Sequence, residues 1–363
     1  MINALRNFYL NSFLYDKKIS KTFNGSLKYK PSTYLLSSIV KIQTKKINID
    51  EFALESVWND NNLNQKQFRK LNNFFWIFSL DLKSSSSSVQ KIIENWIEVN
   101  HKYNSKSWEF DLTSKRIIAW LSNHTLTIDG SGKDYLDIFN GMIQKQTNHL
   151  INEINYSKNI HDKMIGCSAI ILVGLSYKDK NKYLSYGLIL LKKISNLAFD
   201  NNGFTKSRSI KQLIFYLKYF ILIREWFKEA QVEVPELVNE TIFYLGQGYK
   251  FLWQNIHTDI LMNGNNVSNN SEFDHYLKRF SYKFKNENRE FGGYAILNDK
   301  KISIAMDIGE PPSSKFSTEY QSGSLSFEIV SNGKKLISNC GYYDGKNDKL
   351  VKLSKSTATH STL

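Results

Sequence analysis

The chain has 363 residues, of which 41% are hydrophobic and 14% aromatic. This composition supports a sizeable buried core and excludes a disordered chain, and the length suits two domains better than one. The formal net charge of +14 points to nucleic acid, an anionic membrane or an acidic polysaccharide as partner. The excess is nearly all Lys in an Asn-, Lys- and Ile-rich chain, a pattern that AT-rich genomes also produce. Charge alone therefore does not choose the partner.

The cysteines and the hydropathy of the chain bear on its compartment. Cys167 and Cys340 are isolated thiols, which excludes a disulfide framework and zinc-type spacing. No run approaches the ~20 apolar residues of a membrane helix, so no membrane span is expected. Residues 1–17 lack a continuous apolar stretch and a small-residue cleavage site, so they make a poor signal peptide. Either the chain is cytoplasmic, as the sequence taken literally indicates, or its export signal is missing or unusual.

The first two thirds of the chain are predicted to be mainly helical. Residues 1–65 read as an irregular N-terminal arm packed on a larger body, and 66–265 as a helical domain whose apolar residues recur at helical spacing. Because the connections are short and turn-like, the helices should form hairpins, which stack into a bundle, a solenoid or a closed toroid. The expected helices cover residues 89–103, 112–126, 135–154, 164–176, 183–197, 210–230 and 237–257.

After about residue 270 the pattern changes to short strands. Asn332-Gly333 lies between two β-like runs and predicts a hairpin. Residues 270–363 are therefore expected to form a partial antiparallel sandwich. A further C-terminal region is expected, because Leu363 falls where another strand begins; the alternative is a small sheet that is complete as it stands. The expected strands cover residues 278–284, 294–297, 302–308, 324–329 and 334–339.

Four groups of residues form an ordered pattern along the chain. They are Trp108-x7-Arg116-x3-Trp120; Asn148-His149-Leu150 with the apolar run 170–175; Asn202-Gly203-x4-Arg208-Ser209; and, in the β part, Gly293-Tyr294, Asp307-x-Gly309-x-Pro311-Pro312, Gly323-x-Leu325-Ser326-Phe327-Glu328, Asn339-Cys340-Gly341 and Ala358-x-His360-Ser361-Thr362-Leu363. No single motif is specific. Their order and spacing together resemble the heparinase II/III-like family of polysaccharide lyases, over most of the chain after roughly residue 50.

The resemblance implies a multi-domain α and β fold, with an N-terminal α/α toroid, a C-terminal antiparallel β-sandwich that is incomplete here, and a substrate cleft between them. It implies a polysaccharide lyase that cleaves an acidic, uronic-acid-containing glycan by β-elimination, in the periplasm or cell envelope of a bacterium. No cofactor is expected to be required, and the sequence leaves open a structural metal in the β part. The expected partner is the acidic polysaccharide, with no nucleic acid; the oligomeric state is left open.

The resemblance places Asn148, His149 and His360 at the catalytic centre. Asn148 would neutralise the substrate carboxylate, while His149 and His360 would handle protons or the carboxylate. Arg208, at the start of a long helix, would hold the anionic substrate. Taken without the resemblance, the Asn-His pair is more often a polar helix face. The alternative for His360 is an exposed strand histidine, and for Arg208 a helix-start arginine paired with a nearby acid.

The chain also departs from the family pattern. Where some relatives carry the catalytic Tyr, Gln212 stands here, with Tyr216 one turn further on; where many carry a His, Tyr320 stands. Together with Arg208, these three residues are the predicted substrate-binding set. The acid is then Tyr216, Tyr320 or Tyr342, or a His does both tasks, or the chemistry is weakened.

Two other functions compete with the lyase. The departures favour a non-catalytic glycan-binding or cell-envelope protein on the same scaffold. A nucleic-acid-binding helical protein rests on charge alone. The sequence contains no Gly-x4-Gly-Lys-Ser/Thr phosphate loop, no Gly-x-Ser-x-Gly elbow and no His-x3-His metal spacing.

Overall fold

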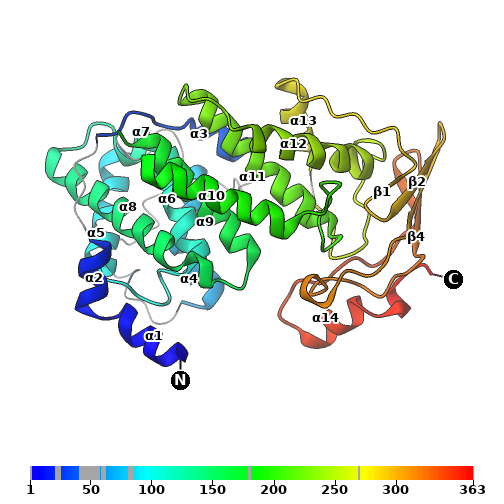
Figure 1. Ribbon diagram of the computed structural model, residues 1–363, viewed down its shortest axis with the longest axis horizontal. Helices are drawn as coiled ribbons and strands as arrows, with labels where there is room; N and C mark the ends of the chain where they lie inside the picture. The colour runs from blue at the N-terminus through cyan, green and yellow to red at the C-terminus, as the bar shows by residue number, and fades with distance from the viewer. Residues whose placement is uncertain are drawn as a thin grey trace. The chain divides into compact units, whose positions relative to one another are not determined.

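The computed structural model describes residues 2–20, 26–40, 58, 63–80, 85–178, 181–268 and 270–362. Its contacts divide the chain into two compact units. Unit 1 comprises Met1–Ile194 and Leu222–Glu233, and unit 2 comprises Ser195–Ile221 and Val234–Leu363. Figure 1 shows the helical elements and the C-terminal sheet. None of the described helices is long and apolar enough to cross a membrane.

The N-terminal arm is helical where an irregular segment was predicted. It forms α1 (Ile2–Leu10), α2 (Phe13–Ile19) and α3 (Thr33–Ile39). The side chain of Ser12 caps α2 by accepting a hydrogen bond from the Tyr15 amide, and Tyr15 and Ile19 bury one face of the helix. Short helices of this kind depend on packing against a larger body, which a local pattern does not reveal. Residues 41–57 and 59–62 of the predicted arm lie outside the described part.

Helices α4 to α9 belong to unit 1, and α10 and α11 contribute residues to both units. The predicted helices are confirmed, with one correction: the expected helix 112–126 is two helices. Asn123 ends the first of them: its backbone leaves the helical conformation (φ −108°, ψ 37°), and its side-chain amide joins its backbone amide in donating to the Ala119 carbonyl. The bounds are α4 (Gln65–Asn72), α5 (Ser86–Asn100), α6 (Phe110–Ser122), α7 (His124–Thr127), α8 (Lys133–Glu153), α9 (Ile160–Ser176), α10 (Asn181–Ala198) and α11 (Ile210–Glu229).

Helix α9 forms the centre of unit 1. Every residue from Met164 to Ser176 is buried, and α9 packs most extensively on α6. Glycines allow a close approach to α10: a Cβ on Gly174 would come within 2.6 Å of the Leu184 backbone, and a Cβ on Gly187 within 2.6 Å of the Ile171 side chain. Larger residues at these positions would push the two helices apart.

The Trp108, Arg116 and Trp120 motif belongs to the core of unit 1. All three side chains are buried. The Arg116 guanidinium lies over the Trp96 ring, and it donates to the Asn72 carbonyl at 2.7 Å and to other neutral acceptors. Burial lowers the pKa of Arg116 well below its usual value. The motif that opens the family pattern therefore has a packing role here.

Unit 2 contains three further helices and a sheet. They are α12 (Glu236–Tyr249), which continues as a π-helical turn over Lys250–Gln254, α13 (Ser271–Arg279) and α14 (Asp348–Ser354). The predicted strand 278–284 is wrong. Its first two residues end α13, which buries Phe273, Tyr276 and Leu277 at helical spacing, and the alternation that follows has no strand partner among the described residues.

The sheet has the four other predicted strands and one short additional strand. The strands are β1 (Glu290–Phe291), β2 (Tyr294–Asn298), β3 (Ile302–Asp307), β4 (Phe327–Ser331) and β5 (Lys334–Ile337). They pair in chain order and all antiparallel. The predicted hairpin is confirmed: Ser331 pairs with Lys334, and Asn332 and Gly333 both have positive φ, as a two-residue turn of this type requires.

The two faces of the sheet differ in burial. Tyr294, Ile296 and Val330 are buried on one face, together with the carboxylates of Asp307 and Glu328. The opposite face also carries apolar side chains, which are exposed or half-buried: Leu297, Ile302, Ile304, Phe327, Ile329 and Ile337. A sheet that is apolar on both faces is typical of one layer of a sandwich.

Candidate functional site

Asn148 and His149 lie on α8 in unit 1 and point to different neighbours. Asn148 is half-buried; its amide donates to the Ile19 carbonyl at 2.8 Å and accepts from the Tyr183 hydroxyl at 2.7 Å. Consecutive residues of a helix diverge by about 100°, so His149 faces elsewhere. Helix α2 contacts both residues, since it carries Ile19 and also Tyr15, whose hydroxyl lies 2.7 Å from His149 Nδ1.

His149 sits in an aromatic cage. Its side chain is 2% exposed, and the rings of Tyr15, Tyr103, Trp108 and Phe110 surround it. Burial lowers its pKa to about 3, although a hydrogen bond with the Trp108 backbone raises it in part. The imidazole is therefore neutral near pH 7, and it is held by a hydroxyl and a backbone group.

A pocket of about 460 Å³ opens beside His149. Its two guanidinium groups are paired within the protein: Arg6 with Glu153, and Arg69 with Glu109 and Asp111. The lining residues are Arg6, Asn7, Leu10, Arg69, Tyr103, Ser105, Trp108, Glu109, Phe110, Asp111, His149, Asn159 and Asp162. Burial and the charge of Asp111 raise the pKa of Asp162. The pocket thus joins aromatic walls to two guanidinium groups and three acidic side chains.

Arg208 lies in unit 2 and is engaged by the protein itself. Its φ of +56° is left-handed, a conformation that non-glycine residues rarely adopt. The guanidinium makes five hydrogen bonds to carbonyl and carboxylate oxygens, of which the shortest is to the Asp307 carboxylate at 2.5 Å. The other four reach the carbonyls of Gly292, Gly293, Gly309 and Glu310. A guanidinium has five N–H donors, so a substrate anion would have to displace one of these acceptors.

Close contacts fix the position of Arg208. A Cβ on Gly293 or on Gly309 would lie 2.7 Å from the guanidinium, so only glycine leaves room for it. Burial lowers the pKa of Arg208, but Tyr294 and the Asp307 carboxylate raise it by more, which keeps the group charged. The sequence-based alternative of a helix-start arginine paired with an acid describes these contacts. A substrate-binding role for Arg208 stays a prediction.

Gln212 and Tyr216 share one carboxylate neighbour. Gln212 accepts from the Ser207 hydroxyl at 2.7 Å and donates to Glu319 at 3.2 Å. Tyr216 is buried; burial and the charge of Glu319 raise the pKa of its hydroxyl, and its ring packs edge-on against Phe199. A contact of Gln212 or Tyr216 with substrate stays a prediction.

Tyr320 and His360 both lie near Asp307. Tyr320 is half-buried, its hydroxyl is a hydrogen-bond partner of Arg208, and burial and the charge of Asp307 raise its pKa. His360 follows a 3₁₀ turn in extended conformation and packs on Gly323. Burial lowers its pKa, while a backbone contact with Ser354 and the carboxylates of Asp307 and Glu328 raise it in part. Both ring nitrogens are shielded from solvent.

The structure therefore gathers part of the predicted set. In unit 2, Arg208 pairs with Asp307, Tyr320 is hydrogen-bonded to Arg208, and the charge of Asp307 acts on Tyr320 and His360. Gln212 donates to Glu319, whose charge also acts on Tyr216. Asn148 and His149 belong to unit 1. Among the described residues, no cluster of three or more His, Cys, Asp or Glu side chains forms a metal site.

Sequence reasoning missed several supporting residues. Asn263 donates to Asp307 at 2.8 Å and to the Tyr294 hydroxyl at 2.7 Å, and that hydroxyl donates to the Arg208 carbonyl at 2.6 Å. Tyr15, the partner of His149, lies 134 residues away in the chain. The motifs containing Tyr294 and Asp307 gave a signal, but the segments around Asn263 and Tyr15 gave none.

Comparisons with known proteins agree with this architecture. Residues 289–363 match the family model "Heparinase II/III-like, C-terminal". No curated protein matches the chain. A crystal structure of heparinase III superposes with a TM-score of 0.65 at 13% identity, covering 95% of this chain and 65% of that one. Heparan sulfate lyase HepC from Pedobacter heparinus gives 0.66 at 12% identity, covering 99% of this chain and 64% of that one.

These likenesses confirm the predicted fold class. At 12–13% identity they show the fold and not the activity. The chain spans less than two thirds of the length of both solved structures. The predicted resemblance is confirmed: residues 289–363 match the heparinase II/III-like C-terminal family, and the chain has the fold of heparinase III.

Proposed function

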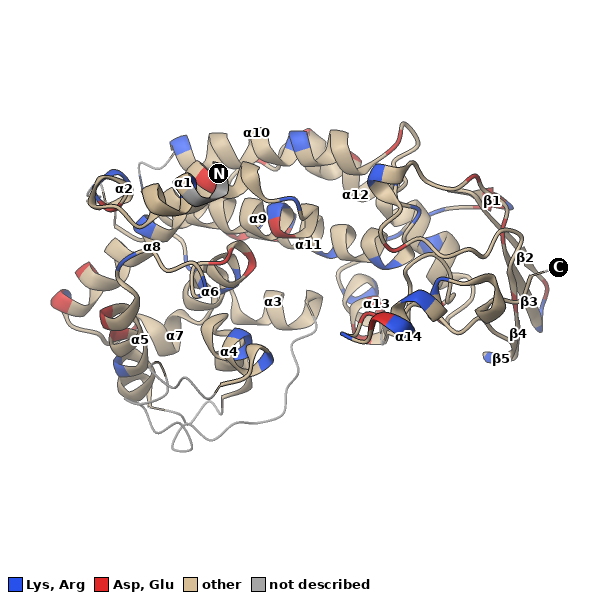
Figure 2. Ribbon diagram, turned by 90° about the horizontal axis from the view of Figure 1, so that it is seen from below, with Lys and Arg blue, Asp and Glu red and all other residues tan. Residues whose placement is uncertain are grey.

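We propose that the chain is part of a polysaccharide lyase that cleaves an acidic, uronic-acid-containing glycan by β-elimination. The observation that carries the proposal is the likeness in fold, over 95–99% of the chain, to proteins named heparinase III and heparan sulfate lyase. The net charge of +14 is compatible with an anionic glycan. Figure 2 shows the Lys and Arg residues spread over many elements of both units.

β-Elimination on a uronate needs three things. A base removes the C5 proton next to the carboxyl group, an acid protonates the leaving glycosidic oxygen, and the developing enolate needs stabilisation. The C5–H bond and the C4–O bond break, and a C4–C5 double bond forms. One proton moves to the base and another leaves the acid, so no redox partner is required.

In the proposed mechanism, His360 is the base and Tyr320 the acid. The lowered pKa of His360 keeps its imidazole neutral near pH 7 and able to accept a proton. The raised pKa of Tyr320 keeps its hydroxyl protonated, and the adjacent Arg208 cation stabilises the phenolate that forms when the proton leaves. Tyr320 is preferred to the buried Tyr216 because its half-buried side chain can reach a ligand.

The mechanism requires a local movement of His360. Its ring nitrogens are shielded, so the side chain has to change rotamer before it can meet a C5 proton. Arg208 then acts through Tyr320 and the Asp307 pair, with no need to release its backbone acceptors. The carboxylate-neutralising role of Asn148 and a proton-transfer role of His149 remain predictions.

A second candidate is a glycan-binding protein without catalysis on the same scaffold. The shielded His360 and the saturated guanidinium of Arg208 favour it. The two candidates separate when ultraviolet absorbance of unsaturated uronate is followed with heparan sulfate, alginate and hyaluronan. Absorbance that rises with the native protein, and is lost in His360→Ala and Tyr320→Phe but not in the control Tyr343→Phe, supports the lyase. Glycan binding without any product selects the second candidate.

A further inference from the structure

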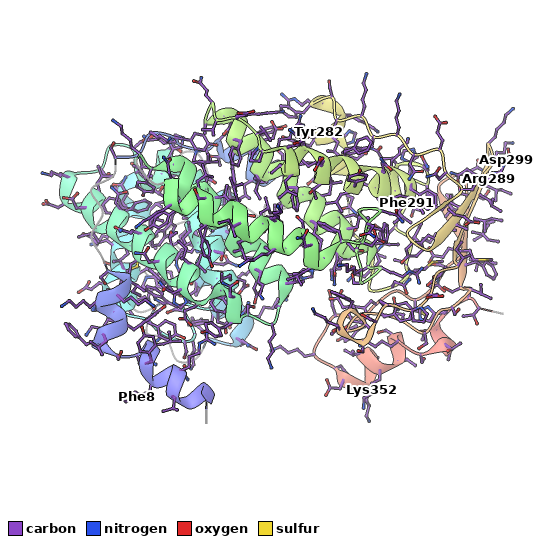
Figure 3. All side chains as sticks on the ribbon, in the orientation of Figure 1. Phe8, Tyr282, Arg289, Phe291, Asp299 and Lys352 are labelled. Carbon is purple, nitrogen blue, oxygen red and sulfur yellow. The ribbon has the colours of Figure 1, made fainter. Side chains whose placement is uncertain are left out.

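Two adjoining pockets in unit 2 have neither Asp307 nor Glu319 among their lining residues, although the larger one includes Gly292 and Gly293, whose carbonyls accept from Arg208. One has a volume of about 620 Å³ and the other about 440 Å³, both within the range of roughly 300–1,000 Å³ that is usual for ligand sites. They share Asn201 and Tyr244. The segment 199–206, helix α12 and the start of the sheet build them, and Figure 3 labels Phe291 in the strand β1 that lines the larger pocket.

Four amide side chains line the larger pocket without an internal use. Asn201, Asn202 and Asn288 are exposed and Gln247 is half-buried. Within the described part of the chain, these four side-chain amides make no hydrogen bond to the protein. Each offers two N–H donors and a carbonyl acceptor. Several unengaged donor and acceptor groups therefore converge on one concavity.

Tyr244 lines both pockets and contributes an aromatic side chain to each. It is 44% exposed. Gly203 has a φ of +74°, and a Cβ on it would lie 2.3 Å from Tyr244 Cβ, so the loop reaches under Tyr244 only because this residue is glycine. The Asp200 carboxylate holds the same loop by accepting from the Asn202 and Phe204 amides, both at 2.9 Å.

The charge of these pockets differs in sign from that of the whole chain. Their lining includes the acidic residues Asp200, Glu240 and Glu290, and Lys206 is the one cation among the lining residues. The Lys206 ammonium donates to the Asn196 carbonyl. A polyanion such as the proposed substrate, or a nucleic acid, would meet a net negative surface here.

We propose that these two pockets bind an uncharged oligosaccharide, with neighbouring sugar rings on either side of Tyr244. Side-chain amides can donate to and accept from neighbouring hydroxyl groups of a sugar at the same time. An aromatic ring packs against the apolar C–H face of the ring. The site differs in side chains, charge and ligand class from the proposed acidic-glycan site, and it does not depend on that proposal.

The test is a calorimetric titration of the protein with neutral β-glucan and chitin oligosaccharides. A heparan sulfate oligosaccharide, a mononucleotide and a short polar peptide serve as comparison ligands. We expect saturable binding of at least one neutral oligosaccharide, with little dependence on salt. Tyr244→Ala and the double variant Asn202→Ala/Asn288→Ala should weaken it by about tenfold or more, as loss of a central aromatic contact does.

Two matched controls lie on the same helix. Phe243 is 58% exposed and lines neither pocket, so Phe243→Ala removes an aromatic ring from the same turn, although it contacts the Tyr244 ring edge-on. Asn239→Ala removes an exposed amide outside the pockets. Both should bind within about twofold of the native protein, and an unchanged thermal midpoint checks that each variant folds.

Three outcomes would overturn the proposal. The first is that no neutral oligosaccharide binds. The second is binding that Tyr244→Ala and the double amide variant leave unchanged. The third is preferential binding of the peptide, the nucleotide or the acidic oligosaccharide at this site. Loss of lyase activity has no bearing on these outcomes, because they are read from binding.

Discussion

The two histidines predicted to be catalytic lie in contrasting surroundings. His149 in unit 1 is enclosed by four aromatic rings, bonded to Tyr15, and has a pKa of about 3. His360 in unit 2 is half-buried beside Asp307 and Glu328, whose charges partly offset the effect of burial on its pKa. His149 is therefore held in its neutral state, while protonation of His360 requires less free energy. The difference between their pKa values comes from burial and neighbouring charge, which the sequence motifs do not reveal.

The largest expected effect on stability comes from removing the ion pair between Arg208 and Asp307, the carboxylate whose charge acts on His360. Arg208→Ala removes the cation and leaves the Asp307 carboxylate buried and unpaired by charge. We expect the free energy of unfolding to fall by about 3–5 kcal/mol, as for other buried pairs that lose one partner. Urea denaturation measures it. In the exposed pair Lys211–Asp344, Lys211→Ala should change stability by less than about 1 kcal/mol; equal losses in the two variants would contradict the account.

A pH series sharpens the comparison at His149. The pKa is about 3 in the folded chain and 6.5 in the usual reference, so the unfolded chain binds the proton more readily. The stabilisation is present above pH 6.5 and is lost as the pH falls toward 3. Between pH 7 and pH 5 it amounts to about 2 kcal/mol at ~1.4 kcal/mol per unit. The difference between native protein and His149→Asn, followed by urea denaturation at each pH, isolates it; parallel curves would refute the buried, neutral state.

Removing one hydroxyl tests the partner of His149. Tyr15→Phe keeps the ring contacts and deletes the hydrogen bond to Nδ1. We expect a loss of about 1 kcal/mol in unfolding free energy, the usual net worth of a buried hydrogen bond. Tyr9→Phe provides a control, because this more exposed ring lies beside Tyr15 on the neighbouring helix. An equal loss of stability in Tyr9→Phe would contradict a specific contribution of the hydrogen bond between Tyr15 and His149.

The smallest effect on stability is expected at His360. His360→Gln changes a half-buried side chain whose ring makes few strong contacts. The unfolding free energy should change by about 1 kcal/mol or less. A loss of several kcal/mol, measured by the same denaturation, would make His360 a core residue like His149 and remove the contrast between the two units.

Much of the fold could be predicted from periodicity. The helices from α5 to α12 and four of the five strands follow apolar spacing, and Asn332-Gly333 marked its hairpin. The N-terminal helices could not be predicted in this way, because they are short and gain stability from contacts such as Arg6 with Glu153, 147 residues apart. Asn123 likewise ends one expected helix early, with a non-helical backbone and a side-chain bond to the Ala119 carbonyl that apolar spacing does not show.

The site could be predicted only in part. Arg208, Tyr320 and His360 carried signals in the sequence, and all three feel the charge of Asp307, which Arg208 contacts directly. The sequence gave no indication that the Arg208 guanidinium is saturated by four backbone carbonyls and one carboxylate, since such contacts depend on where glycines let the backbone approach. Nor could it show that Asn148 is held by Ile19 and Tyr183.

The most direct test of the central claim is a product assay on acidic glycans. The protein is incubated with heparan sulfate, alginate and hyaluronan at pH 7, and the ultraviolet absorbance of the new C4–C5 double bond is followed beside a His360→Gln variant of equal stability. The account predicts unsaturated product from at least one glycan, and none from the variant. Binding of an acidic glycan with no product, or equal product from both proteins, would contradict it.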